Sequence, residues 1–142
     1  MKGYLILTNN LEQKYYRWKD HFFGCDLFPI QVGKTYNTND YKEYTLDTYI
    51  DDKTGTLKKH NFTFYTTLNR RAYMEAQDCG YDSFRICKIK TKGPTKYCKA
   101  GSHANVITVV EEITGEKLIK IKNKWRKKYQ ETLDQIFKEL GL

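Results

Sequence analysis

The C-terminal part of the chain has the most regular pattern of apolar and polar positions. Its apolar residues recur at steps of three and four, as they do on one face of an α-helix. These residues are Leu118, Ile121, Trp125, Tyr129, Leu133, Ile136 and Leu140. Thr114 is a suitable N-cap and Gly141 a suitable stop. The pattern therefore predicts a long amphipathic helix over residues 115–140.

Helical spacing also occurs in two shorter segments. Asn10 can cap a first helix over 10–23, which Gly24 would end, and Thr67 can cap a second helix that would end at Gly80. The apolar positions that carry the spacing are Leu11, Tyr15, Trp18 and Phe22 in the first segment and Leu68, Ala72 and Ala76 in the second. Both segments are predicted to bury one face of a helix against the core.

The remaining segments alternate apolar and polar residues or are rich in β-branched residues, which is typical of strands. The predicted strands and extended segments are 3–8, 26–36, 44–50, 62–65, 83–90 and 104–113. Turn residues at 51–55 should join two of them into an antiparallel hairpin, and Gly93 with Pro94 should end the strand 83–90. Consecutive apolar residues at 106–110 predict a central strand covered on both faces.

The predicted order β-α-β-β-β-α-β-β-α lacks the strict alternation of a doubly wound fold. We therefore expect an α+β fold with a mixed or antiparallel sheet, about three helices and a single domain over 1–142. No apolar run approaches the roughly 18 residues that a membrane helix requires. The short apolar stretch near Met1 does not fit a signal peptide, so the expected location is the cytoplasm.

Positive charge is concentrated in one segment of the chain. The formal net charge is +8, and residues 83–130 alone carry 13 basic and 3 acidic residues, a net charge of +10. Codon bias in an AT-rich genome would raise the number of lysines but would not gather them in one segment. The segregation therefore indicates an anionic partner, either nucleic acid or an acidic protein surface.

The lysines of this segment are the candidate binding residues. They are Lys88, Lys90, Lys92, Lys96, Lys99, Lys117, Lys120, Lys124 and Lys127. The last four recur at helical spacing on the N-terminal half of the predicted helix 115–140, where positive charge opposes the helix dipole. A solvated helix face is the alternative explanation for these four.

The sequence contains little that predicts catalysis. It has no glycine-rich phosphate loop and no nucleophile-elbow motif. Its four cysteines have no C-x-x-C spacing, so we expect reduced and mostly buried thiols and no structural metal. The neighbouring Glu111 and Glu112 lie on a predicted strand, where adjacent side chains point to opposite faces and cannot easily share a proton.

Residues 61–91 resemble part of the ADP-ribosyltransferase pattern. The segment Asn61–Ala72 has a strand that ends in Tyr-Thr-Thr and leads into a short helix, and the segment Tyr81–Ile89 follows as a strand. In that family a residue at the end of the strand helps to hold nicotinamide, and a later carboxylate orients the ribose. The resemblance implies Tyr65, Thr66 and Glu112 as candidate residues, with NAD as the cofactor.

The whole chain is also loosely similar to small proteins of phages and their bacterial relatives. The similarity lies in its start, Met1 to Tyr4, and in the segment Val32 to Tyr36. It implies an accessory protein of a mobile element.

We therefore expect a non-enzymatic binding protein without a cofactor. Its partner would be nucleic acid or a nucleoprotein effector of the host, as for an anti-CRISPR-type inhibitor of a defence nuclease. An ADP-ribosyltransferase-like enzyme and a structural component of a virion are the alternatives.

Overall fold

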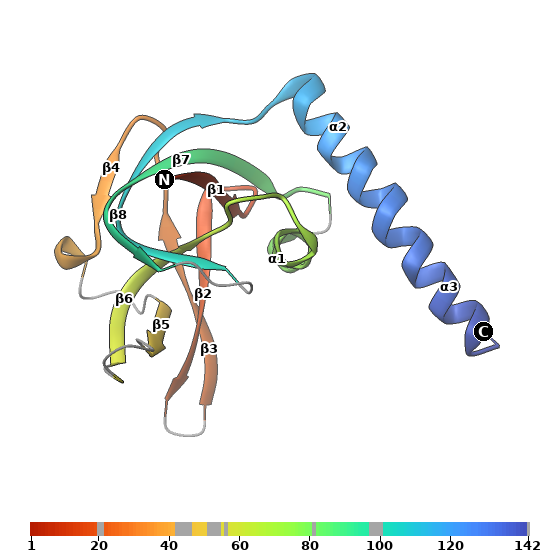
Figure 1. Ribbon diagram of the computed structural model, residues 1–142, viewed down its shortest axis with the longest axis horizontal. Helices are drawn as coiled ribbons and strands as arrows, with labels where there is room; N and C mark the ends of the chain where they lie inside the picture. The colour runs from red at the N-terminus through yellow and green to blue at the C-terminus, as the bar shows by residue number, and fades with distance from the viewer. Residues whose placement is uncertain are drawn as a thin grey trace. The chain divides into compact units, whose positions relative to one another are not determined.

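The computed structural model describes residues 1–19, 22–41, 47–50, 55, 57–80, 82–96 and 101–141 (Figure 1). The chain divides into two compact units, Met1–Glu112 and Ile113–Leu142. Among the described residues, the first unit contains the sheets, one α-helix and the short 3-10 helix η1 (Thr38–Asp40), and the second contains the C-terminal helix. Each unit is described by itself.

An antiparallel sheet forms the first unit. Its strands follow the order β1-β7-β8-β6-β5, and β4 pairs with β8 beside this path. The strands are β1 (Lys2–Leu7), β4 (Thr35–Asn37), β5 (Asp47–Ile50), β6 (Leu57–Phe64), β7 (Arg85–Lys96) and β8 (Ser102–Glu112). Figure 1 shows β7 and β8 as long curved strands, with β1 beside β7. The predicted α+β class with an antiparallel sheet is confirmed, whereas the single domain over 1–142 stays a prediction.

A pair of backbone hydrogen bonds closes this sheet on itself. The amide of Tyr4 donates to the carbonyl of Tyr65 over 2.7 Å, and the amide of Tyr65 donates to the carbonyl of Tyr4 over 2.9 Å. Because Tyr65 directly follows β6, the bridge joins the end of β6 to the edge of β1 that β7 does not use. The strands β1, β7, β8 and β6 therefore form a closed ring around a single core.

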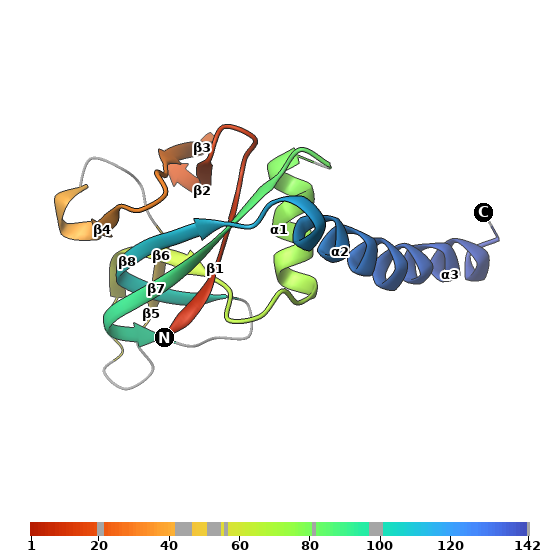
Figure 2. The same ribbon diagram turned by 90° about the horizontal axis from the view of Figure 1, so that it is seen from above.

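Both faces of β1 are covered, but by different elements. Leu5 and Leu7 belong to the core inside the ring, together with Phe62, Phe64 and Ile107. The alternate position carries Ile6, which pairs with Ile86 of β7 and is also buried. The helix α1 (Arg70–Gly80) packs on β1 from outside the ring, as Figure 2 shows. Its fully buried residues Ala72 and Ala76 are four positions apart and so lie on one helix face.

The helix predicted over 10–23 is wrong, because these residues form a hairpin. Strand β2 (Glu12–Lys19) pairs antiparallel with β3 (Phe22–Pro29). The segment is rich in tyrosine, tryptophan and phenylalanine, which favour strands, and this preference outweighs the helical spacing. Gln13 shows the difference, because it is buried and its side-chain amide donates to the carbonyl of Thr63 over 2.6 Å.

The turn before β2 also differs from the predicted helix cap. Asn10 is not an N-cap. Instead, the backbone amides of Asn10 and Glu12 donate hydrogen bonds to the hydroxyl oxygen of Thr8, over 3.4 and 3.2 Å. Leu11 takes the left-handed conformation with φ of 55°, an unfavourable geometry for a side chain with a Cβ. Its amide donates to the carbonyl of Thr8 over 3.0 Å, and its carbonyl accepts from Ile30 over 2.8 Å.

Two smaller boundaries were also predicted incorrectly. The N-cap of α1 is Asn69 rather than Thr67, because the Asn69 side chain accepts from the amide of Ala72 over 3.0 Å. Strand β7 does not end at Gly93 and Pro94 but continues to Lys96 through a register shift against β8. Such an irregularity accommodates proline, which cannot donate a ladder hydrogen bond. The predicted turn at 51–54 lies outside the described residues.

The hairpin and the C-terminal helix are confirmed. Strands β5 and β6 pair antiparallel, and the second unit is helical through α2 (Gly115–Trp125), a π-helical turn η2 (Arg126–Gln130) and α3 (Glu131–Glu139). Thr114 occupies the N-cap position with extended backbone, although its side chain makes no capping hydrogen bond. Gly141 follows with φ of 74°, as expected for a helix stop. Within the described residues, none of the helices has the length and apolar character needed to cross a membrane.

The closure of the ring depends on Gly3, which has no side chain. A Cβ at Gly3 would lie 2.5 Å from Cδ2 of Phe64 and 2.8 Å from the carbonyl oxygen of Tyr65. We expect Gly3→Ala to lower the free energy of unfolding by about 1–3 kcal/mol, because the core must move to admit the methyl group. Urea denaturation measures this change. Lys2→Ala, at the exposed neighbouring position, should change stability by less than about 0.5 kcal/mol. Equal effects of the two substitutions would contradict the close approach.

Candidate functional site

Three of the candidate lysines lie in a row on the outer face of β7. Lys88, Lys90 and Lys92 occupy alternate positions of the strand, so their side chains share one face. The intervening Ile89 is buried in the core. The strand thus separates an apolar inner row from a basic outer row.

The neighbouring strands extend this outer face in both directions. On β1, Lys2 is the direct partner of Lys90, and Tyr4 is the partner of Lys88. On β8, Thr108 is the partner of Lys90, and Thr35 of β4 is in turn the partner of Thr108. The two threonine hydroxyls are 2.8 Å apart. We call this surface the lysine face; it consists of Lys2, Tyr4, Lys88, Lys90, Lys92, Thr108 and Thr35.

A hollow of about 320 Å³ lies at one end of the lysine face. It is lined by Lys2, Gly3, Tyr4, Thr66, Lys88, Ile89, Lys90, Val110 and Glu111. Three lysines and one glutamate therefore line the same hollow. Ile6 of β1 and Ile86 of β7 lie on the same outer side of the sheet, further along the two strands, and are buried. The hollow therefore begins where this apolar part of the surface ends.

One of these lysines has an acidic partner. The ammonium of Lys88 is 3.2 Å from a carboxylate oxygen of Glu111, its neighbour across the strands. Their side chains are 38% and 55% exposed, so solvent screens the pair and it stabilises the fold by less than about 1 kcal/mol. The pair leaves the remaining positive charge of the hollow uncompensated.

The other lysines of the face create an unfavourable electrostatic arrangement. Lys2 and Lys90 are cross-strand partners, and like charges directly opposite each other destabilise a sheet. The structure gives no ion pair between Lys2, Lys90 or Lys92 and any residue that it describes. A bound anion would relieve this repulsion, so the arrangement favours phosphate or carboxylate groups as ligands.

The remaining predicted lysines do not all join this face. Lys96 is the last residue of β7, and its side chain, like all of Lys99, lies outside what the structure describes. Lys117, Lys120, Lys124 and Lys127 are exposed on the C-terminal helix, which belongs to the second unit. Lys2, by contrast, was missed because it lies far from the basic segment in the sequence. The predicted strand 3–8 also began one residue too late, whereas β1 starts at Lys2, where the alternation with Tyr4 could have placed it.

The residues implied by the ADP-ribosyltransferase resemblance lie apart. Thr66 lines the hollow, and Tyr65 is only 8% exposed at the closure of the ring. Phe64, the neighbour of Tyr65, pairs with Ser102 at the start of β8, whereas Glu112 is the last residue of that strand. Neither Tyr65 nor Glu112 lines the hollow. The structure therefore brings these residues to no common cavity among those it describes.

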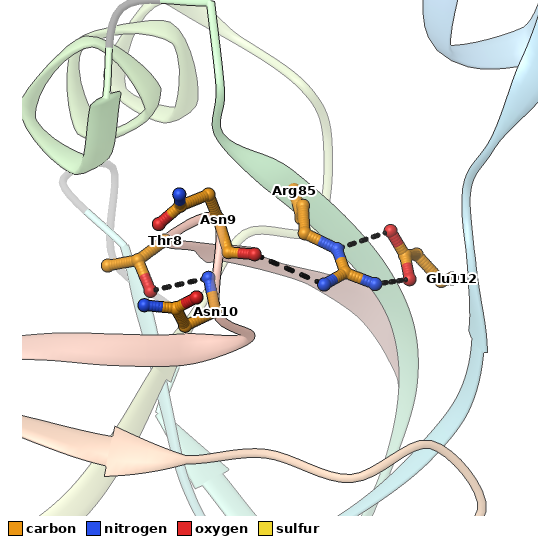
Figure 3. Close-up of polar contacts among 5 residues, drawn as sticks. All are labelled: Thr8, Asn9, Asn10, Arg85 and Glu112. Carbon is orange, nitrogen blue, oxygen red and sulfur yellow. Dashed lines mark hydrogen bonds and ion pairs between the residues drawn. The ribbon is translucent and has the colours of Figure 1, made fainter.

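Glu112 instead holds three segments of the first unit together. Its two carboxylate oxygens accept hydrogen bonds from Nε and Nη2 of Arg85, at 2.8 and 2.5 Å. Nη1 of Arg85 also donates to the carbonyl of Asn9 over 3.2 Å (Figure 3). The hydrogen bonds with Glu112 raise the pKa of the Arg85 guanidinium. The ends of β1, β7 and β8 are thus joined by a bidentate ion pair, which is a structural role.

The two adjacent glutamates lie on opposite faces of β8, as strand alternation predicts. Glu111 reaches Lys88 at the hollow, whereas Glu112 binds Arg85. The two carboxylates therefore do not act on one substrate.

Cys79 and Cys87, the cysteines whose side chains the structure describes, are not activated. Burial, together with the charges of Glu75 and Asp78, raises the pKa of Cys79 to about 12. Burial also raises the pKa of Cys87 to about 11. Both thiols are protonated at neutral pH and are poor nucleophiles. Among the described residues, no group of three or more His, Cys, Asp or Glu side chains is placed to hold a metal ion.

The adjacent glutamates offer a matched pair of substitutions. We expect Glu112→Gln to lower the free energy of unfolding by about 1–3 kcal/mol, because it weakens two hydrogen bonds to a charged guanidinium. Glu111→Gln removes the same charge from an exposed pair and should cost less than about 0.5 kcal/mol. Thermal and urea unfolding of both variants provide the comparison, and a larger loss for Glu111→Gln would refute the assigned roles.

The thiol pKa values predict slow alkylation. In the folded protein at pH 7.5, Cys79 and Cys87 should react with iodoacetamide far more slowly than they do in denaturant, because the thiolate is the reactive form. Mass spectrometry of the separate peptides measures each rate. Rapid labelling of Cys79 in the native protein would show that its thiol is activated.

Comparison with known proteins does not assign the chain to a family. No family model matches it, and no curated protein or solved structure matches it either. Its function must therefore be inferred from the charge and geometry of its own residues.

Proposed function

We propose that this protein is a non-enzymatic nucleic-acid-binding protein whose lysine face holds backbone phosphates. The observation that carries the proposal is the direct cross-strand pairing of Lys2 with Lys90 at a hollow that Lys88 also borders. A phosphate seated there would accept hydrogen bonds from more than one ammonium group, and such charge-assisted bonds are the strong ones.

The spacing of the lysines suits a ligand with repeated negative charges. Alternate residues of a strand are about 7 Å apart and neighbouring strands about 4.8 Å. Lys88, Lys90 and Lys92 therefore form a row along β7, and Lys2 lies beside its middle. A single small anion would occupy one point of this row, whereas a nucleic acid backbone would engage its whole length.

The hydroxyl groups of Thr108 and Thr35 continue the lysine face across β8 and β4. Hydroxyl side chains commonly donate to phosphate oxygens in nucleic acid complexes. An exposed sheet surface with lysines and hydroxyls offers contacts that do not depend on base sequence. The proposed binding is therefore directed mainly at the backbone.

The proposed ligand is either free nucleic acid or the nucleic acid of a nucleoprotein complex. A guide-RNA-bearing defence nuclease, inhibited as by an anti-CRISPR-type protein, would present such a backbone. The lysines of the C-terminal helix would provide a second basic surface for the same ligand. The arrangement of Tyr65, Thr66 and Glu112 provides no support for NAD binding, and no described feature favours a virion component.

The experiment compares two sets of charge reversals. Binding of a labelled single-stranded oligonucleotide is measured by fluorescence anisotropy as a function of salt. For Lys2, Lys90 and Lys92 together changed to Glu, we expect an affinity loss of about 100-fold at 0.1 M salt. The slope of log K against log salt should become shallower by about 2, because each lost phosphate contact contributes about 0.7.

Lys117, Lys120 and Lys124 changed together to Glu form the matched control with the same change in net charge. If the lysine face makes the main contacts, this control variant should lose less affinity than the lysine-face variant. Its slope of log K against log salt should also stay closer to that of the unaltered protein. Equal losses in both variants would mean that net charge alone governs binding. Unchanged binding after reversal of the lysine face would refute the proposal.

A further inference from the structure

An aromatic cavity lies on the other side of β4 from the threonines of the lysine face. Its volume is about 300 Å³, and its walls include Phe28, Gln31, Lys34, Tyr36 and Tyr41. This volume is at the lower end of the range for small-molecule sites, so the cavity is suited to a ligand the size of one ring system. Phe28 and Tyr36 are only 1% and 3% exposed, so the half-buried ring of Tyr41 is the wall on which a flat, aromatic occupant would stack.

The aromatic walls are held in fixed orientations by one another. The Phe28 ring packs edge to face on Tyr36 and Tyr41, with centroids 5.5 and 4.9 Å apart. The buried hydroxyl of Tyr36 accepts a hydrogen bond from the amide of Gln31 over 2.8 Å. Burial raises the pKa of this hydroxyl, so it stays protonated at physiological pH. The walls are therefore preorganised, which lowers the entropic cost of binding.

The charge at the rim selects against a cationic occupant. The ammonium of Lys34 lies 5.0 Å from the centroid of the Tyr36 ring, within cation–π distance. It takes the position that a methylated lysine or another cation would need, and it would repel such a ligand. The same ammonium attracts a phosphate or carboxylate attached to an aromatic ring. A nucleotide has both features.

The cavity is close to the proposed path of the phosphates. Thr35 lies between Lys34 and Tyr36 in the sequence, and its hydroxyl contacts Thr108 on the lysine face. From β7 across β8 to β4 is two strand spacings, about 10 Å. The cavity also lies beside the short edge strand β4, so a chain on the lysine face reaches it by passing around this edge.

We infer that this cavity binds one unstacked base of the nucleic acid strand whose phosphates lie on the lysine face. The inference rests on the proposed function and adds a base-binding position to it. Stacking on an aromatic side chain contributes about 1–3 kcal/mol per base and tolerates any sequence. Gln31 at the cavity wall has the polar groups needed to bind the edge of a base.

The test compares two oligomers of equal charge. One is a ten-residue oligothymidylate, and the other is an abasic ten-mer with the same backbone. The unaltered protein should bind the oligothymidylate about 10-fold more tightly, and Tyr41→Leu should abolish this preference without changing the affinity for the abasic oligomer. Tyr73→Leu, a half-buried tyrosine of α1, is the matched control and should keep the preference.

Lys34→Glu is a second test variant. Because Lys34 is exposed, the substitution does not require the core to repack. It should weaken the binding of thymidine 5′-monophosphate at least about 5-fold and leave the unfolding midpoint unchanged. Equal binding of both oligomers by the unaltered protein would overturn the base site while leaving phosphate binding intact. Failure to bind either oligomer would instead overturn the proposed function on which the inference rests.

Discussion

The backbone bridge between Tyr4 and Tyr65 is the constraint on which the first unit depends. It gives β1 a partner on both edges, since β7 already pairs with the other one. Without this bridge, the edge of β1 would present unpaired amides and carbonyls, which favour aggregation. The bridge also encloses the core and requires Gly3 to approach Phe64 closely. The same strand then carries Lys2 to the side of β7, so the closure and the lysine face have one structural origin.

The outer surface of β1 and β7 has an apolar part, which stabilises the fold, and a basic part, which we propose as the binding surface. Where Ile6 pairs with Ile86, the surface is apolar and buried, and Ala72 and Ala76 let α1 approach. A few residues along, Lys2 pairs with Lys90 and both residues are exposed. Removing apolar area from water stabilises the first part, whereas repulsion between ammonium groups slightly destabilises the second. Retaining a locally unfavourable cluster is common at sites that bind ligands.

Glu111 and Glu112, the acidic residues next to the lysine face, differ in how they affect its charge. Glu112 binds Arg85 and lies on the opposite face of β8 from Glu111, so it does not lower the charge of the lysine face. Glu111 compensates Lys88 through an exposed pair, which an incoming phosphate can replace at little cost. The protonated thiols of Cys79 and Cys87 likewise provide no nucleophile. Among the described residues of this surface, Lys2, Lys90 and Lys92 thus carry positive charge that no ion pair offsets.

The sequence by itself determined the elements whose secondary structure follows from a local pattern of residues. The helix after Thr114 and the hairpin of β5 and β6 follow from periodicity and turn residues alone. Strand β8 is also present, but the prediction that both of its faces are covered is wrong, because Val110 is 43% exposed whereas Ile107 and Val109 are buried. The segregation of charge along the chain likewise identified Lys88, Lys90 and Lys92 as candidates. Only the tertiary structure decided that residues 12–19 form a strand, because Gln13 finds its partner on Thr63, far away in the chain. Only strand pairing placed Lys2 beside Lys90, since contacts between distant segments depend on register, which local spacing does not encode.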